Sequence, residues 1–345
     1  MLSWKLPASS LAWLLSTACM LLLGSTAVHA ADRALLVGVG KYPLLPGKQL
    51  AGPANDLRLM TSTLARLGWP ASQVQVLSDA AGPAQWPTRA HILAALAQLA
   101  AQAQPGDWVV VYFSGHGSQV PQMVTTRAKF REPDGLDEVF LPMDTSAWDP
   151  AQRIVVGAIT DDEMNAALAR ITNKGAQVWA IFDTCHAGDM LRGAPIASGD
   201  EPPVWRYVSP LDLKVPVEEL SRSFGQASRR PGRAQPPLPV VAERAASSAG
   251  QRWVGFFASQ ADEGAAEESL PDPEQPQRKQ RFGVFTHLIH QAAAQWRGSF
   301  AELAARLQQG YRDRPFPTPE FQGHLSAVPR FAAAAADSAL TPQPR

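Results

Sequence analysis

The chain has 345 residues, with 31 Lys and Arg against 31 Asp and Glu, so its formal charge at neutral pH is zero. This balance disfavours a nucleic-acid binder that works through bulk positive charge. Hydrophobic residues make up 46% of the chain and charged residues 18%, which allows a substantial core and excludes wholesale disorder.

The first 30 residues have the form of a secretory signal peptide. Lys5 precedes an apolar run at 11–23, and Val28-His29-Ala30 places small residues at the last and third-last positions before a cleavage site. We therefore predict cleavage after Ala30, export to the periplasm or outside of a bacterium, and no stable membrane association afterwards. The alternative is an N-terminal anchor that is retained, although the run is short for a membrane span.

The chain after residue 30 alternates apolar strands with helices. Continuous apolar runs predict strands buried on both faces. Apolar residues at helical spacing, with Pro53, Thr88 and Thr160 at helix starts, predict the helices between them. This alternation indicates an α/β fold with a mostly parallel sheet and helices on both faces. The predicted strands are 34–39, 73–77, 108–113, 177–182 and 252–258, and the predicted helices are 53–67, 88–102, 160–171, 283–296 and 299–309.

Between residues 192 and 250 the composition shifts to Pro, Gly, Ser, Ala and Arg, with no sustained periodicity after Val217. This texture predicts a flexible insertion. The Ala-rich end predicts a frayed tail. The predicted organisation is a leader at 1–30, a first region at 31–191, the insertion at 192–250, a second region of the same domain at 251–330 and a tail at 331–345.

Only one cysteine is left once the leader is removed, because Cys19 lies in the apolar run and Cys185 does not. No intramolecular disulfide can then form. A lone thiol often only fills a core, so its neighbours in the sequence must decide its role.

Two of the predicted strands end in polar residues that carry chemistry. Strand 108–113 continues into Ser114-Gly115-His116-Gly117-Ser118, and strand 177–182 continues into Asp183-Thr184-Cys185-His186. In an open parallel sheet, ligands bind beyond the carboxyl ends of the strands, where neighbouring loops lie side by side. We therefore expect the imidazole and the thiol to meet in space.

A thiol beside an imidazole is suited to acyl transfer, because the free thiol is only a few per cent ionised at neutral pH. We assign Cys185 as nucleophile and His116 as general acid/base. The backbone N–H groups of Gly117 and Cys185 are the predicted oxyanion donors. A backbone carbonyl could orient the imidazole. A zinc site built from these clusters is the alternative, although they lack the usual ligand spacing.

These residues resemble the metacaspases, the caspase-like cysteine peptidases, including their bacterial members. Tyr112 to Gln119 is similar to the family's histidine motif, and Asp183 to Gly188 is similar to its cysteine motif, with Ala187 in place of serine. The resemblance implies a caspase-like sheet in which region 31–191 is large-subunit-like and region 251–330 is small-subunit-like. Further similar segments are 50–56, 134–138, 258–263 and 283–286.

The resemblance also implies cleavage of peptides or proteins after Arg or Lys, with Asp56, Ser114 and Asp183 as the substrate-binding residues. Carboxylates suit this role, because the guanidinium of Arg can engage one with two parallel hydrogen bonds. The alternative assigns Asp56 to a solvated first turn of a helix and Asp183 to a loop cap.

No cofactor is required for this chemistry, and we assign no metal ligands. Many relatives bind Ca²⁺ through an acidic cluster, of which Asp161 and Asp162 match one part. Arg192 lies where another acidic ligand is expected, and a site with fewer carboxylates binds Ca²⁺ more weakly. We therefore expect little dependence on calcium.

An Arg-specific peptidase could cut itself in the insertion, where Arg222, Arg229 and Arg233 lie. Arg230 is disfavoured because Pro231 follows it. We expect a monomer with no nucleic-acid partner. The principal alternative for the whole chain is a catalytically silent relative that binds peptides in the same cleft.

Overall fold

The computed structural model describes part of the chain, with gaps. The predicted leader and the residues from 332 onward lie outside the described residues. So do His186, Arg192, the disfavoured Arg230 and the predicted cleavage positions Arg229 and Arg233. Within the described part, no helix is long and apolar enough to cross a membrane. The described residues are 31–122, 135–185, 201–227, 251–260, 263–312, 314 and 317–331.

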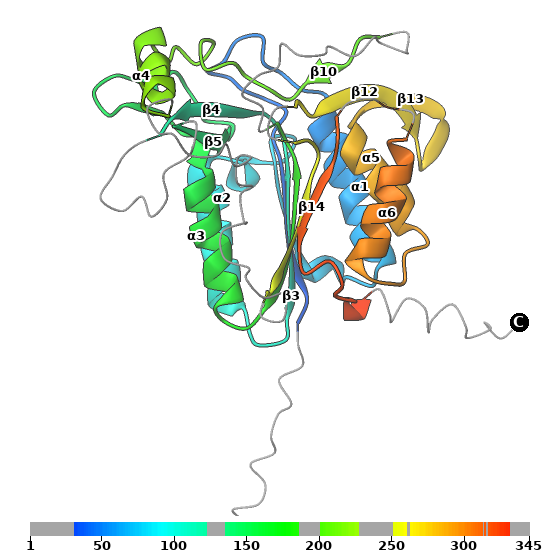
Figure 1. Cartoon of the computed structure of the whole chain (residues 1–345). Helices are drawn as coiled ribbons and strands as arrows, with labels where there is room; N and C mark the ends of the chain where they lie inside the picture. The colour runs from blue at the N-terminus through cyan, green and yellow to red at the C-terminus, as the bar shows by residue number, and fades with distance from the viewer. Residues whose placement is uncertain are drawn as a thin grey trace, which may run out of the picture. The chain divides into compact units, whose positions relative to one another are not determined.

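A six-stranded sheet forms the centre of the fold, with the order β14-β11-β9-β3-β1-β2 (Figure 1). All neighbours are parallel except β14, which is antiparallel to β11. The predicted fold class is thus confirmed, and the five predicted strands end within one residue of their expected positions. The strands are β1 (Arg33–Gly38), β2 (Val74–Ser78), β3 (Trp108–Ser114), β9 (Gln177–Asp183), β11 (Trp253–Phe257) and β14 (Glu320–Gly323).

Helices cover both faces of this sheet (Figure 1). The side chain of Thr88 accepts the N–H of His91, and Thr160 forms a capping box with Glu163, so both predicted helix starts are confirmed. One face carries α2 and α3, and the other carries α1, α5 and α6. Their bounds are α1 (Gly52–Arg66), α2 (Arg89–Gln102), α3 (Asp161–Thr172), α5 (Val284–Ala293) and α6 (Phe300–Gly310).

Short antiparallel strands gather beyond the carboxyl ends of the parallel strands, at the top of Figure 1. The sequence analysis did not predict them, because they are brief and lack a continuous apolar run. One group is β4 (Gly117–Pro121), β5 (Leu136–Phe140) and β8 (Ile159–Thr160), and another is β10 (Val204–Trp205), β12 (Ala266–Asp272) and β13 (Gln275–Gly283). A third pair is β6 (Trp148–Asp149) with β7 (Ile154–Val155), and the 3-10 turns are Ala71–Gln73 and Pro83–Gln85.

Part of the predicted insertion has a defined structure. Residues 201–227 contain β10 and the helix α4 (Val217–Ala227), and the side chains of Arg206, Val208 and Leu213 have no exposed surface. Phe331, where we expected the tail to begin, is also buried, against Trp69 and Trp108. The burial of these residues could not be predicted from the local proline and arginine content, because it depends on partners elsewhere in the chain.

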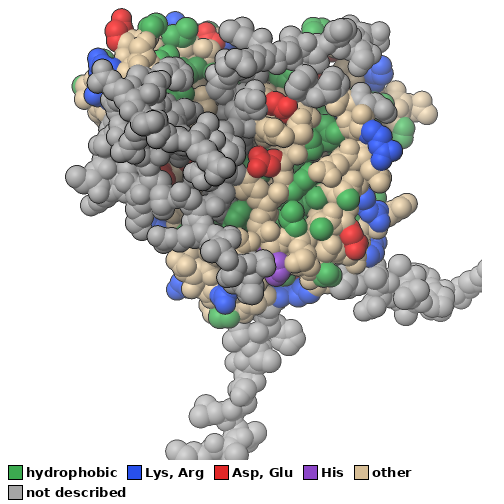
Figure 2. Space-filling model, viewed as in Figure 1, with side chains coloured by type: hydrophobic (Ala, Val, Ile, Leu, Met, Phe, Trp, Pro, Cys, Tyr) green, Lys and Arg blue, Asp and Glu red, His purple; other side chains and the backbone are tan. Residues whose placement is uncertain are grey.

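The apolar core is divided by the sheet into two clusters. One lies under α2 and α3, and the other lies under α1, α5 and α6, where Trp179, Trp296 and Phe300 pack edge to face. On the face drawn in Figure 2, basic side chains follow the outer edge, and hydrophobic side chains lie between them and the grey segments. The sheet with its two cores fixes the ends of β3 and β9, on which the site is built.

Candidate active site

The two loops that carry the predicted dyad are neighbours. β3 and β9 pair in parallel, so that Ser114 lies opposite Asp183. Beyond these residues the loops remain in contact, since a Cβ atom placed on Gly117 would lie 1.8 Å from the carbonyl oxygen of Cys185. Only glycine fits there, which explains the residue after the histidine.

His116 is buried and held by the backbone. Its backbone N–H donates to the hydroxyl of Tyr42 at 2.8 Å, and its ring Nε2 lies 3.0 Å from the carbonyl oxygen of Lys48. Because a carbonyl can only accept, Nε2 carries the proton, and Nδ1 is left as the basic nitrogen. Nδ1 is buried and makes no hydrogen bond within the described residues. The carbonyl of Lys48 therefore supplies the orienting group that no side chain in the sequence indicated.

Burial lowers the pKa of His116 to about 4, although the nearby backbone of Lys48 and Arg206 opposes this shift. The imidazole is therefore neutral at pH 7, as a general base requires. Cys185 is equally buried, with Sγ 3.4 Å from the carbonyl oxygen of Ala265. Burial raises the pKa of the Cys185 thiol, and the charge and backbone of Arg206 act in the opposite direction. Thiol and imidazole are thus both uncharged in this state.

The lowered pKa of His116 predicts a loss of stability in acid. The unfolded chain, whose histidine keeps the ordinary pKa near 6.5, binds a proton that the folded chain does not bind between pH 6.5 and 4. The free energy of unfolding therefore falls as pH falls through this window, by about 3 kcal/mol from this residue. Urea denaturation at pH 7 and pH 4 should show that His116→Gln removes most of this difference. If wild type and His116→Gln lost the same free energy of unfolding between pH 7 and pH 4, the pH dependence would not come from His116.

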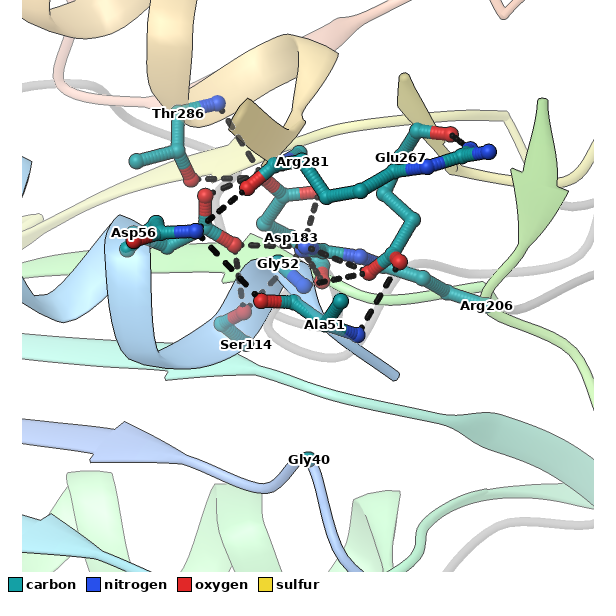
Figure 3. Close-up of polar contacts among 12 residues, drawn as sticks. Gly40, Ala51, Gly52, Asp56, Ser114, Asp183, Arg206, Glu267, Arg281 and Thr286 are labelled. Atoms are coloured by element: carbon teal, nitrogen blue, oxygen red, sulfur yellow. Dashed lines mark hydrogen bonds and ion pairs between the residues drawn. The ribbon is translucent and has the colours of Figure 1, made fainter. Parts of the chain in front are cut away.

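The three predicted substrate-binding residues line one buried acidic pocket (Figure 3). Ser114 Oγ donates to Asp56 Oδ2 at 2.8 Å, which links α1 to β3. The N–H of Gly283 donates to Asp56 Oδ1 at 2.9 Å, and Thr286 donates to Asp183 Oδ2 from its N–H and its hydroxyl at 3.0 and 2.5 Å. These bonds do not exhaust the acceptor capacity of the two carboxylates, and Asp56 Oδ2 and Asp183 Oδ1 face the pocket interior.

The pocket is filled by a guanidinium of the same chain, that of Arg206 (Figure 3). Its Nη2 lies 2.5 Å from Asp56 Oδ2, and its Nη1 lies 3.0 Å from Asp183 Oδ1. Nη1 also donates to Ser114 Oγ at 3.0 Å and to the carbonyl of Asp183 at 2.9 Å. Glu267 on β12 adds a third carboxylate, 3.7 Å from Nη2.

Two glycines make room for the guanidinium. A Cβ atom on Gly52 would lie 2.7 Å from Nη2 of Arg206, and a Cβ atom on Gly283 would lie 2.6 Å from Nη1. Burial raises the pKa of the Asp56 and Asp183 carboxyls, and Arg206 opposes this shift. The negative charge of Asp56 further raises the pKa of Asp183. A cation in the pocket therefore favours the ionised form of both carboxyls.

The backbone of residues 204–208 runs through the site and bends at Arg206. Val204 and Trp205 form β10, which pairs antiparallel with β12. The Arg206 N–H donates to the carbonyl of Ala265 at 2.9 Å, and the Arg206 carbonyl accepts the N–H of Gly117, also at 2.9 Å. Gly117 N–H is one of the two predicted oxyanion donors; the other, the N–H of Cys185, remains a prediction.

The sequence did not lead us to expect Arg206, Glu267 or Thr286 in the site. The run Val204-Trp205-Arg206-Tyr207-Val208 is rich in β-branched and aromatic residues, and this signal could have indicated a strand inside the proline-rich region. Glu267 lies in a polar stretch that carries no comparable signal.

Three further histidines and the acidic pair considered for Ca²⁺ lie on helices. Asp161 and Asp162 begin α3, His91 is on α2, and His287 and His290 are on α5. Across the residues that the structure describes, no three His, Cys, Asp or Glu side chains are grouped to hold a metal ion.

The fold and site together define an α/β protein with a thiol and an imidazole at adjacent strand ends. The family model described as "Metacaspase, peptidase C14 domain" matches residues 32–193. Residues 32–193 are therefore similar to the peptidase C14 domain of the metacaspases.

Curated metacaspases are similar to the chain over a stretch of nearly the same length. Metacaspase-1A of Aspergillus niger is 35% identical over 161 residues, and Metacaspase-1B of Aspergillus clavatus is 37% identical over 161 residues. Each match covers 46% of this chain and 36% of the relative, so the chain matches about a third of the length of these proteins. The crystal structure of protein GSU0716 from Geobacter sulfurreducens shares the fold, with a TM-score of 0.54, 20% identity, and 88% of this chain and 96% of that chain covered.

Proposed function

We propose that the chain is a cysteine endopeptidase that cleaves peptide bonds after Arg or Lys, with Cys185 as nucleophile and His116 as general acid/base. One observation carries the specificity: the acidic pocket beside Cys185 accommodates a guanidinium. That guanidinium donates hydrogen bonds to Asp56, Ser114 and the Asp183 carbonyl, and it forms an ion pair with the Asp183 carboxylate. A buried pair of carboxylates favours a cation over any neutral or acidic side chain.

The proposed reaction begins from the uncharged pair. Nδ1 of His116 takes the proton of the Cys185 thiol as the sulfur attacks the substrate carbonyl carbon, while Nε2–H stays on the Lys48 carbonyl. The N–H of Gly117 holds the developing oxyanion, a contribution of about 3 kcal/mol per donor. His116 then protonates the leaving amine, and water hydrolyses the thioester to release the new carboxylate and restore the thiol.

The pocket favours Arg over Lys. The two terminal nitrogens of the guanidinium reach different carboxylates, Nη2 reaching Asp56 and Nη1 reaching Asp183. A lysine ammonium is a single point charge and does not span both carboxylates in the same way.

Alkylation by an active-site-directed reagent tests this function. A chloromethylketone peptide ending in Arg is expected to label Cys185 of the chain, located by peptide mapping, and to abolish cleavage of an Arg-ended fluorogenic peptide. Cys185→Ala should be neither labelled nor active. A reagent ending in Asp is the matched control, and we expect it to react at least about 100-fold more slowly, since an acidic group meets two carboxylates.

The same experiment addresses the alternative of a catalytically silent peptide-binding protein. Such a protein would bind the Arg-ended peptide and leave Cys185 unlabelled. Binding without alkylation at saturating reagent would therefore contradict the peptidase.

We further propose that activity depends little on Ca²⁺, because Arg192 stands at the sequence position, past the cysteine motif, where the resemblance implies an acidic ligand. We expect cleavage of the fluorogenic peptide to change by less than about twofold between excess chelator and millimolar Ca²⁺, a concentration that occupies weak sites. Activity that disappears in chelator and returns with Ca²⁺ would overturn this expectation.

A further inference from the structure

We propose that the Arg206–Tyr207 bond is the chain's own first substrate: it lies in the active site, blocks it in the intact chain, and is cut by Cys185 of the same molecule. This inference rests on the proposed function and adds the substrate on which the site first acts. It moves the expected self-cleavage from Arg222, Arg229 and Arg233 to a bond nearer the start of the predicted insertion.

The first support is that residues 204–208 bind as a peptide substrate would. On the side before the bond, β10 adds to the edge of β12, with Val204 opposite Glu267 and Trp205 opposite Ala266. Addition of an extended peptide to a sheet edge is a common mode of peptide recognition. On the side after the bond, the N–H of Val208 donates to the carbonyl of Gly117 at 3.0 Å. The chain is therefore held on both sides of one peptide bond.

The second support is the position of the bond between these anchors. The Arg206 side chain fills the acidic pocket, and the Arg206 carbonyl accepts the Gly117 N–H, the donor that is assigned to the oxyanion. The backbone of Arg206 also contributes to the electrostatic environment of both the Cys185 thiol and the His116 imidazole. Pocket, donor, thiol and imidazole thus converge on this residue.

The third support is that Arg222 is unsuited to cleavage as it stands. It lies within α4, and its side chain is exposed and paired with Glu219. A helical segment must unfold before one of its bonds can enter the cleft, whereas the Arg206–Tyr207 bond lies outside any helix and is already anchored in the site.

The covalent step balances with water as the only co-reactant. The Cys185 sulfur attacks the Arg206 carbonyl carbon and its proton passes to His116. The C–N bond to Tyr207 breaks, and His116 gives the proton to the Tyr207 nitrogen, which leaves as an amine. Water then hydrolyses the thioester, so that Arg206 becomes a C-terminal carboxylate and the thiol is restored.

Cleavage should open the site without separating the two pieces. The first piece holds β1, β2, β3 and β9, the second holds β11 and β14, and β9 pairs with β11 along five residues. The pieces therefore remain in one sheet. The end of the first piece is now held only through residues before the cut, so Arg206 can withdraw and another arginine can enter.

The experiment follows the purified full chain by intact mass and by N-terminal sequencing of new fragments, beside its cleavage of an Arg-ended fluorogenic peptide. We expect wild type to yield a fragment that begins at Tyr207, at a rate independent of protein concentration, and peptide cleavage to rise in step with it. Cys185→Ala should stay whole. The matched control Arg222→Gln, at an exposed arginine, should behave as wild type.

Two variants distinguish the effect of cutting the Arg206–Tyr207 bond from the effect of the Arg206 side chain in the pocket. Arg206→Gln should stay whole, with peptide cleavage from the first time point if the chain folds. Tyr207→Pro keeps the guanidinium and replaces the bond by a prolyl amide. The backbone bonds of Arg206 with Ala265 and Gly117, and of Val208 with Gly117, do not use the Tyr207 N–H, so proline leaves them in place. We expect this variant to stay whole and to cleave the peptide at least 100-fold more slowly than cut wild type.

Two results would overturn the inference and leave the proposed function standing: a first cut at another arginine, or full peptide cleavage by an intact wild-type or Tyr207→Pro chain. If wild type cut neither itself nor any Arg-ended peptide, the proposed function would fall, and the inference with it.

Discussion

Replacing Asp183 by Asn is expected to lower kcat/KM for Arg-ended peptides by about 100- to 1,000-fold, which corresponds to ~3–4 kcal/mol. Asp183 places one carboxylate oxygen 3.0 Å from the guanidinium nitrogen and directs the other to Thr286. An amide removes the negative charge and leaves a buried cation with fewer partners, which is costly in a dry pocket. Initial rates on a fluorogenic peptide give the ratio, each divided by the fraction of chain that intact mass shows to be cut after Arg206.

The matched control for this change is Asp107→Asn. Asp107 is also a buried carboxylate that pairs with an arginine, Arg33, but it lies just before β3, at the end of the strand opposite the pocket. We expect this variant to be less stable and to keep its preference for Arg. Loss of activity of the same size in both variants would attribute the Asp183 effect to folding rather than to substrate binding.

The second large effect is expected from Gly283→Ala, at the wall of the pocket. The added Cβ atom would lie 2.1 Å from Asp183 Oδ2 and 2.6 Å from Nη1 of Arg206. The backbone φ of Gly283 is −58°, so alanine is not strained there and the clash with the pocket is the main consequence. Overlap of this kind costs about 1–3 kcal/mol, or about 10- to 100-fold in kcat/KM.

Gly82→Ala is the control for the glycine change, because its Cβ atom would meet nothing within 4 Å and its φ is −72°. Self-cleavage and peptide cleavage are both measured. Gly283→Ala should be slow in both reactions, while Gly82→Ala should match wild type. Unchanged rates for Gly283→Ala would contradict the view that the substrate arginine occupies this pocket.

The sheet was predictable because each central strand carries its own signal. The runs that became β1, β3 and β9 are apolar throughout, as burial on both faces demands, and Thr160 with Glu163 marks the start of α3 directly. The pairing of β3 with β9 then follows from the alternation of strands and helices. The proximity of the histidine and cysteine loops is a consequence of that pairing.

The occupant of the pocket was not predictable in the same way. Asp56, Ser114 and Asp183 come from α1, β3 and β9, and a motif resemblance named them. The Arg206 side chain is buried because residues of those elements and of β12 surround it in the folded chain. An isolated arginine in a proline-rich stretch looks solvated, and only the tertiary contacts reveal that it satisfies an otherwise repulsive pair of carboxylates. The orienting carbonyl of Lys48 was hidden for a similar reason, since every residue has one.

The most direct test of the account is a cleavage profile of the cut chain on a peptide library with every residue type at the position before the scissile bond. The account predicts products that end in Arg, then Lys, with Asp-ended products absent, and no products from Cys185→Ala. A profile dominated by Asp or by apolar residues, or an identical profile from Cys185→Ala, would contradict it.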